Sequence, residues 1–127
     1  MDDRILPNYQ PMQAIDELQA IDLAVGSGDI VMGGATVTAH YTGALASTGQ
    51  IFQSSHDRLG DQPISFPLSG VIAGWSQGVP GMRVGGTRRL FIPAAMAYGA
   101  NPPAGSGIPP NADLVFDVEV ASVKNMQ

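Results

Sequence analysis

The chain has 127 residues, of which 44% are hydrophobic and 13% charged, a composition typical of one globular domain and not of a disordered chain. It contains no cysteine, which excludes disulfide scaffolds, thiol nucleophiles and cysteine-type metal sites. The net charge of −5 lies entirely in residues 1–30, and residues 31–127 are balanced. A neutral body with few basic residues excludes a phosphate backbone, and so nucleic acid, as an expected partner.

No membrane segment is expected. The residues behind Met1 lack the apolar stretch of a signal peptide, and the longest nearly apolar run, Leu90–Ala100, is broken by Pro93 and Gly99. We therefore expect a cytoplasmic protein without a membrane partner, although removal of a native leader would leave the same sequence.

Residues 1–20 are polar and acidic and contain two prolines. Met12, Ile15 and Leu18 recur at helical spacing, so one short helix is possible there. We interpret residues 1–20 as an acidic N-terminal extension that is partly flexible, most simply a solvated tail. Residues 21–124 form the predicted folded domain.

Short runs of β type, separated by glycine and proline, follow from residue 21. In the last of them apolar and polar residues alternate, and a shift by one residue would bury Asp117 and Glu119, so the pattern fixes the inward face. Pro63 and Pro67 restrict the second run to an edge or bulged strand. The predicted strands are residues 36–41, 64–68, 88–92 and 114–121.

The helical signal is weak, and the best candidate is a single short helix over Val71–Gly78. Gly26–Gly28 is predicted to be a hairpin turn. Several antiparallel strands with one short helix indicate an α+β fold in which the sheet wraps around the helix.

Common catalytic chemistries fit this sequence poorly. Gly74–Gly78 matches the Gly-x-Ser-x-Gly nucleophile elbow, but both histidines, His40 and His56, precede Ser76, whereas the elbow requires a histidine after the serine. Two histidines without cysteine do not provide the ligands of a zinc site. Gly26–Gly28 lacks the third glycine of a dinucleotide fingerprint. We therefore expect neither a metal nor a cofactor.

Seven short blocks remain, and their order and spacing are specific although each alone is weak. They are VTAHYTG (37–43), FQSSHDR (52–58), VIAGW (71–75), GMRVG (81–85), AYG (97–99), IPP (108–110) and LVFDV (114–118). In this arrangement the sequence resembles the FKBP-type peptidyl-prolyl cis-trans isomerases, the immunophilins.

The resemblance implies a curled antiparallel sheet of five to six strands, wrapped around one short α-helix, with a proline pocket between them. It implies an isomerase that accelerates rotation of X–Pro bonds in peptides and unfolded chains without covalent chemistry, and that binds macrolide inhibitors. The catalytic residues that it implies are Tyr98, Phe116 and Phe52, and the substrate-binding residues are Tyr41, Gln53, Arg58, Ile64, Val71, Ile72, Trp75 and Ile108.

The residue types suit this reaction. Rotation about a peptide bond has a barrier of ~18–20 kcal/mol because amide resonance is broken at the midpoint. An apolar pocket removes water from the planar, more polar amide and so favours the twisted one. Trp75 also fits a role in the core alone, and the Tyr41 hydroxyl also fits a structural hydrogen bond within the cavity.

Two positions depart from the family pattern. Gln53 stands where the family usually has an aspartate, which joins a polar cluster with Arg58 and Tyr41. We expect this change to lower activity and to weaken affinity for macrolide inhibitors. Ile64 replaces an aromatic residue and should widen one edge of the pocket. Gln53 also leaves open an alternative function, a non-catalytic proline-peptide-binding or chaperone module of the same fold.

Overall fold

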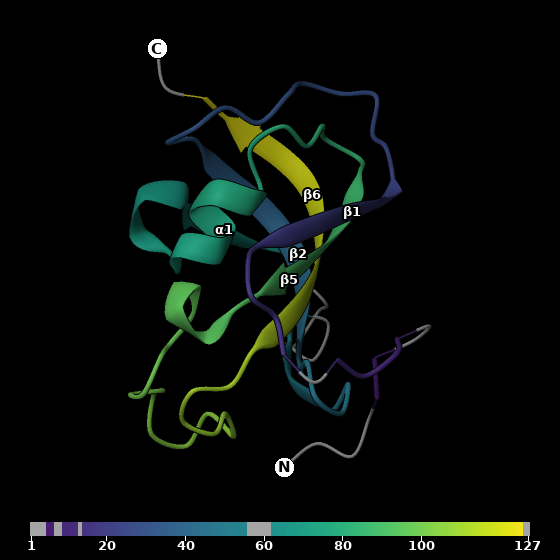
Figure 1. The fold of residues 1–127 in the computed structure, drawn as a ribbon. Helices are drawn as coiled ribbons and strands as arrows, with labels where there is room; N and C mark the ends of the chain where they lie inside the picture. The colour runs from purple at the N-terminus through teal and green to yellow at the C-terminus, as the bar shows by residue number, and fades with distance from the viewer. Residues whose placement is uncertain (1–4, 7–8, 13, 56–61, 126–127) are drawn as a thin grey trace.

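Six antiparallel strands form one sheet in the order β1-β5-β6-β2-β3, and β4 also pairs with β2. The computed structural model describes residues 5–6, 9–12, 14–55 and 62–125. The sheet curls, and α1 lies against its concave face (Figure 1), so the predicted α+β class is confirmed. The elements are β1 (Gln19–Ala24), β2 (Thr36–Leu45), β3 (Ile51–Ser54), β4 (Ile64–Pro67), α1 (Ala73–Gly78), β5 (Thr87–Ile92) and β6 (Leu114–Lys124), with the 3-10 turns η2 (Leu68–Gly70) and η3 (Ala94–Met96).

The long strands β2 and β6 form the centre of the sheet and pair from Thr36↔Lys124 to Leu45↔Leu114. Their side chains alternate in burial, as the sequence predicts. On β6, Phe116 and Val118 are buried while Glu119 is exposed. The inward-facing residues form the core on the concave side of the sheet.

The predicted edge strand is β4, and it pairs only with the first part of β2, from Thr36↔Pro67 to Ala39↔Ile64. The strand ends at Pro67, and Leu68 begins η2 with its side chain buried. Proline cannot donate to a ladder, so this position at the edge is the one that a strand flanked by prolines can take.

The helix α1 approaches β5 closely because two of its residues are glycines. A Cβ at Gly74 would lie 2.5 Å from Cγ2 of Ile92, and one at Gly78 would lie 2.7 Å from Cδ2 of Leu90. Ser76 lies within the helix, and its hydroxyl donates to the carbonyl of Ala73 at 3.1 Å. The Gly-x-Ser-x-Gly pattern is therefore a packing feature of the helix and not a nucleophile elbow.

Two local predictions were wrong. The described part of 9–18 contains no helix; Met12 and Ile15 instead pack on the convex face of the sheet. Gly26–Gly28 is not a hairpin turn, because β1 pairs with β5 and not with the next strand in sequence. The backbone of Gly26–Gly28 instead packs directly against the turn before β5. A Cβ at Gly26 would lie 2.3 Å from the carbonyl oxygen of Val84.

The division into an extension of residues 1–20 and a domain of residues 21–124 remains a prediction. The described helices include none that is long and apolar enough to cross a membrane.

Candidate functional site

A hollow of about 300 Å³ opens on the concave side of the sheet. Its walls come from β2, β3, β4, β6, the segment leading into α1, α1 itself and the loop after η3. The residues that line it are Tyr41, Gln53, Phe66, Gly70, Val71, Ile72, Trp75, Tyr98 and Phe116.

Trp75 is the centre of an aromatic cluster in this hollow. The ring centroids of Tyr41 and Phe116 each lie 5.6 Å from that of Trp75 in edge-on geometry, and that of Phe66 lies 5.1 Å away at 60°. Rings that meet at their edges stabilise one another and leave a concave space between their faces. Trp75 and Phe116 are each only 4% exposed, so both residues are core and wall at once.

Phe52 supports the wall from behind. Its ring meets that of Phe116 edge-on, with centroids 5.7 Å apart, but it does not line the hollow. The two rings meet over β2 because Gly43 lies beneath them: a Cβ there would be 2.6 Å from Cζ of Phe52 and 2.7 Å from Cε1 of Phe116. Phe52 therefore supports Phe116 without lining the hollow, and its catalytic role remains a prediction.

Tyr98 is a half-buried residue at the rim, two residues after η3. Within the described part of the chain its hydroxyl makes no hydrogen bond, so this hydroxyl can donate to a ligand in the hollow. Tyr41 differs, because it is 8% exposed and has further interactions within the protein. Its backbone N–H donates to the hydroxyl of the buried Ser55 at 2.8 Å, which fixes the chain where it leaves β3.

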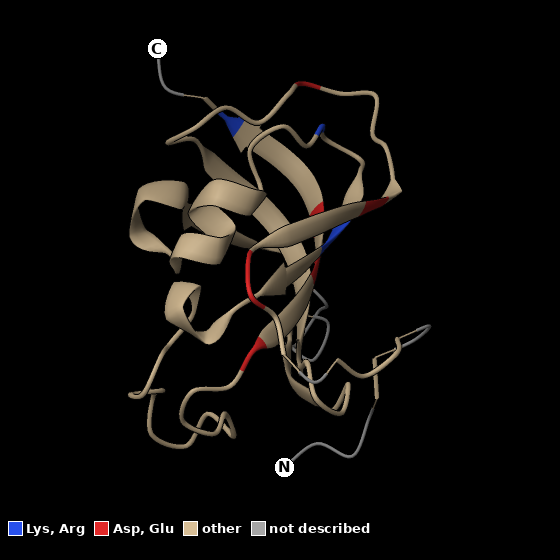
Figure 2. Cartoon of the chain, viewed as in Figure 1, with Lys and Arg blue, Asp and Glu red and all other residues tan. Residues whose placement is uncertain are grey.

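No charged side chain of the described residues lines the hollow. Residues 62–82 and 90–112, which supply most of its rim, contain no Asp, Glu, Lys or Arg. Figure 2 shows the consequence: α1 and residues 93–112 of the loop after β5 carry no charge, whereas acidic and basic residues lie on β1, β5 and β6. The described lining is neutral, and its polar side chains are two tyrosines and the amide of Gln53.

Seven of the predicted site residues line the hollow, and Phe52, Ile64 and Ile108 do not. Ile64 and Ile108 are half-buried and pack against the same core without reaching the cavity. Arg58 lies outside the described residues. The seven are Tyr41, Gln53, Val71, Ile72, Trp75, Tyr98 and Phe116.

Two lining residues, Phe66 and Gly70, are absent from the predicted site. The alternation of Ile64, Phe66 and Leu68 in sequence was the signal that could have placed Phe66, because it puts the Phe66 ring on the same face as its two neighbours. Gly70 gave no such signal.

The described residues contain no group of three or more His, Cys, Asp or Glu side chains placed to hold a metal ion. A curled sheet that holds a short helix over an aromatic hollow defines a site suited to apolar groups, and no acid or base from the described part of the chain lines it.

Comparison with known proteins identifies the family. The family model for FKBP-type peptidyl-prolyl cis-trans isomerases matches residues 27–121. The chain belongs to this family and is an enzyme of this class, as the resemblance implied.

Relatives and solved structures agree. The chain is 46% identical over 110 residues to a probable FK506-binding protein of Corynebacterium glutamicum, covering 86% of this chain and 89% of that protein. It is 51% identical over 96 residues to the peptidyl-prolyl cis-trans isomerase FPR2 of Saccharomyces cerevisiae, covering 74% and 69%. The crystal structure of a peptidyl-prolyl cis-trans isomerase from Pseudomonas syringae has a TM-score of 0.74 at 33% identity, covering 89% of this chain and 80% of that one.

Proposed function

We propose that the hollow over Trp75 is where this isomerase binds the proline ring of its substrate and lowers the barrier to rotation of the preceding peptide bond. The observation that carries the proposal is the aromatic lining of a cavity of about 300 Å³ with the Tyr98 hydroxyl at its rim, which has no hydrogen-bond partner among the described residues. Proline-containing peptides and unfolded chains are the corresponding substrates.

The lining suits a reaction that needs no reactive group. The planar amide is the more polar form, so removing water from it raises its free energy relative to the twisted form. Only contacts that are stronger in the transition state accelerate the reaction. Trp75 and Phe116 exclude water from the amide, and Tyr98 donates a hydrogen bond to the substrate carbonyl.

Desolvation, shape and one hydrogen bond together are large enough to accelerate rotation by several powers of ten. A tenfold acceleration requires about 1.4 kcal/mol, and one hydrogen bond contributes roughly 0.5–1.5 kcal/mol. Desolvation and shape must supply the rest, which makes the aromatic walls more important than the single donor.

Gln53 sets the expected strength of the site. Its amide lines the hollow but carries no charge, so it cannot form the ion pair that an aspartate would form with an arginine. We infer that activity is reduced and that a macrolide of the FK506 type, after which several relatives are named, binds with weakened affinity. Gln53→Asp should raise both by roughly two- to fivefold, which the isomerisation rate and a macrolide titration would measure.

The proposal is tested by the rate of cis-to-trans isomerisation in a series of X–Pro tetrapeptides. We expect Tyr98→Phe to lower kcat/KM by roughly two- to tenfold, the equivalent of one hydrogen bond. Ser76→Ala is the matched control, because it removes a hydroxyl next to Trp75 that bonds only within the helix.

Two outcomes would contradict the proposal. Full activity in Tyr98→Phe would remove the donor role. A rate equal to the uncatalysed one in the unmodified protein, with Trp75 fluorescence still responding to peptide, would favour the non-catalytic binding module.

A further inference from the structure

The described residues of 5–16, called the strap here, cover the convex face of the sheet, opposite the hollow. Leu6 and Ile15 are buried there, with Tyr9 and Met12 packed against the same cluster. The backbone N–H groups of Leu6 and Met12 donate to the carbonyls of Gly49 and Ala46, at 2.8 and 2.9 Å, and the Tyr9 hydroxyl also donates to Ala46. The strap is an ordered part of the fold, although the family model begins only at residue 27.

Asp113, the residue before β6, links the strap to the start of η3. Its Oδ2 accepts a hydrogen bond from the backbone N–H of Ile15 at 2.9 Å, and its Oδ1 accepts one from the backbone N–H of Ala94, also at 2.9 Å. Its backbone carbonyl accepts a third from Ala46 at 3.0 Å. One carboxylate therefore holds two segments that are far apart in sequence.

Ala94 holds the loop that carries Tyr98 through backbone hydrogen bonds. It begins η3, whose N-cap residue, Pro93, provides no side-chain acceptor. An unpaired backbone N–H at a helix start is costly unless a side chain accepts from it, and Asp113 does so. The carbonyl of Ala94 in turn accepts from the N–H groups of Ala97 and Gly99, at 3.0 and 2.9 Å, on either side of Tyr98.

We propose that Asp113 is a positioning residue for catalysis, which fixes the Tyr98 loop against the sheet and couples its order to the docking of the strap. The proposal rests on the proposed role of Tyr98 as a donor to substrate. It gives the strap a function in activity as well as in stability.

The test uses Asp113→Asn in the full chain. The two backbone N–H groups donate to different oxygens of the carboxylate, and in the amide one of these oxygens is replaced by an NH2 group, which donates and cannot accept. We expect kcat/KM to fall roughly three- to fivefold, and the same change in a Tyr98→Phe background to cost less than about 1.5-fold, because the group being positioned is already gone. Asp16→Asn is the matched control, an equal charge change at an exposed strap residue, and should leave the rate unchanged.

Additive losses in the two backgrounds would overturn the positioning role, since a general structural effect does not depend on the Tyr98 hydroxyl. Full activity of Tyr98→Phe alone would instead overturn the proposed function, so the two failures are distinguishable.

A second variant tests the coupling from the strap. Ile15→Ala keeps the donating N–H but removes the buried side chain, so the strap should dock less tightly. We expect faster hydrogen exchange at both the residue-15 and Ala94 amides. Faster exchange at the residue-15 amide with unchanged exchange at Ala94 would show that the two segments are independent and would overturn the coupling.

Discussion

The two faces of this sheet are closed in different ways, and neighbouring residues on β6 show the contrast. Phe116 points to the concave side, where it contacts three other aromatic rings. Asp117 points to the convex side, where it accepts two hydrogen bonds from Arg89, at 2.7 and 2.9 Å. The concave side is covered by a helix and a loop that leave a neutral hollow. The convex side is covered by the N-terminal strap, which backbone and side-chain hydrogen bonds hold against the sheet.

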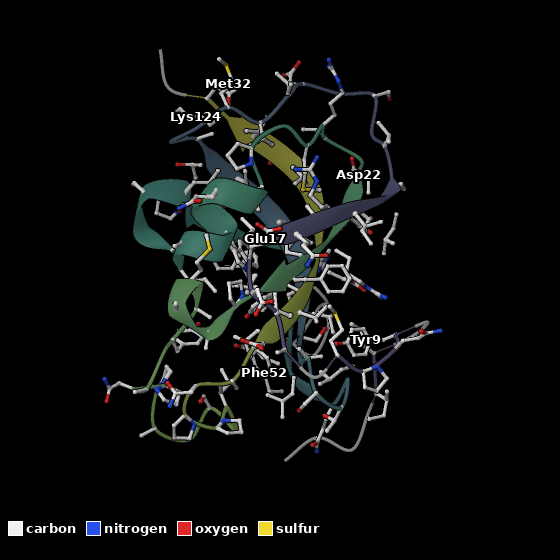
Figure 3. All side chains as sticks on the ribbon, viewed as in Figure 1. Tyr9, Glu17, Asp22, Met32, Phe52 and Lys124 are labelled. Atoms are coloured by element: carbon white, nitrogen blue, oxygen red, sulfur yellow. The ribbon has the colours of Figure 1, made fainter. Side chains whose placement is uncertain are left out.

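The difference shows which side is suited to the reaction. A charge without an ion-pair partner beside the hollow would hold water near the substrate amide and would oppose desolvation. Charges on the convex side have partners instead: the Arg89 guanidinium also lies 5.8 Å from the centre of the Tyr9 ring. Figure 3 shows Tyr9 on the side of the sheet away from α1. Hydrogen bonding to Asp117 raises the pKa of Arg89, and burial raises the pKa of Tyr9.

The largest expected effect comes from removing one phenylalanine from each face. Phe116→Ala and Phe91→Ala each delete a ring that is at most 9% exposed, so each should lower the free energy of unfolding by about 3–4 kcal/mol. Only Phe116→Ala should abolish most of the activity, with kcat/KM at least tenfold lower, against less than about threefold for Phe91→Ala. Denaturant unfolding and the isomerisation rate measure the two quantities, and equal activity losses would show that the hollow has no special role.

A smaller effect on stability is expected from the charged pair of the convex face. Arg89→Met leaves the partly buried Asp117 without its bidentate partner, which should cost about 2–3 kcal/mol. The activity of the folded fraction should be unchanged, because the pair lies on the side away from the hollow. A loss of kcat/KM with little loss of stability would contradict the separation of the two faces.

The smallest effect is expected at the pair formed by Asp22 of β1, which is exposed, and Arg88 of β5, which is half-buried. Arg88 donates to Asp22 at 2.6 Å, and this hydrogen bond lowers the pKa of the Asp22 carboxyl. A lowered pKa means that the contribution to stability is present above the ordinary carboxyl pKa and is lost as the pH falls through the folded-state value. Asp22→Asn should therefore lower stability by no more than about 0.5 kcal/mol at pH 7, since the pair is screened by solvent, and the difference from the unmodified protein should vanish in acid.

Thermal unfolding of the two proteins between neutral and acidic pH measures this difference. A difference that grows as the pH falls would have the wrong sign and would show that the pair with Arg88 does not stabilise the fold.

Much of the fold could be predicted from local patterns, because β2 and β6 each bury one face, which fixes their register and the inward position of Phe116. Seven of the nine lining residues followed from the family blocks, and Phe66 and Gly70 did not. The course of the strap could not be predicted: Met12, Ile15 and Leu18 have helical spacing, but backbone partners at residues 46, 49 and 113 hold the segment in an extended form.

The same limit applies to the site. Gly26–Gly28 has the composition of a hairpin turn, and only the distant Val84 explains its glycines. Asp113 gave no signal because its two partners, Ile15 and Ala94, are remote in sequence and come together only in the folded chain. The spacing of apolar residues predicts which face of a strand is buried, but it does not predict which distant segments pack against that face.

The central claim is that a neutral aromatic hollow accelerates rotation about an X–Pro bond without a reactive group, and the pH dependence of the reaction tests it most directly. The measurement is the cis–trans exchange rate of a Leu–Pro tetrapeptide, followed by NMR at catalytic protein concentration between about pH 6 and pH 9. We predict a rate well above the uncatalysed one that changes by less than about twofold over this range. A bell-shaped profile, or a rate equal to that of the peptide alone, would contradict the account.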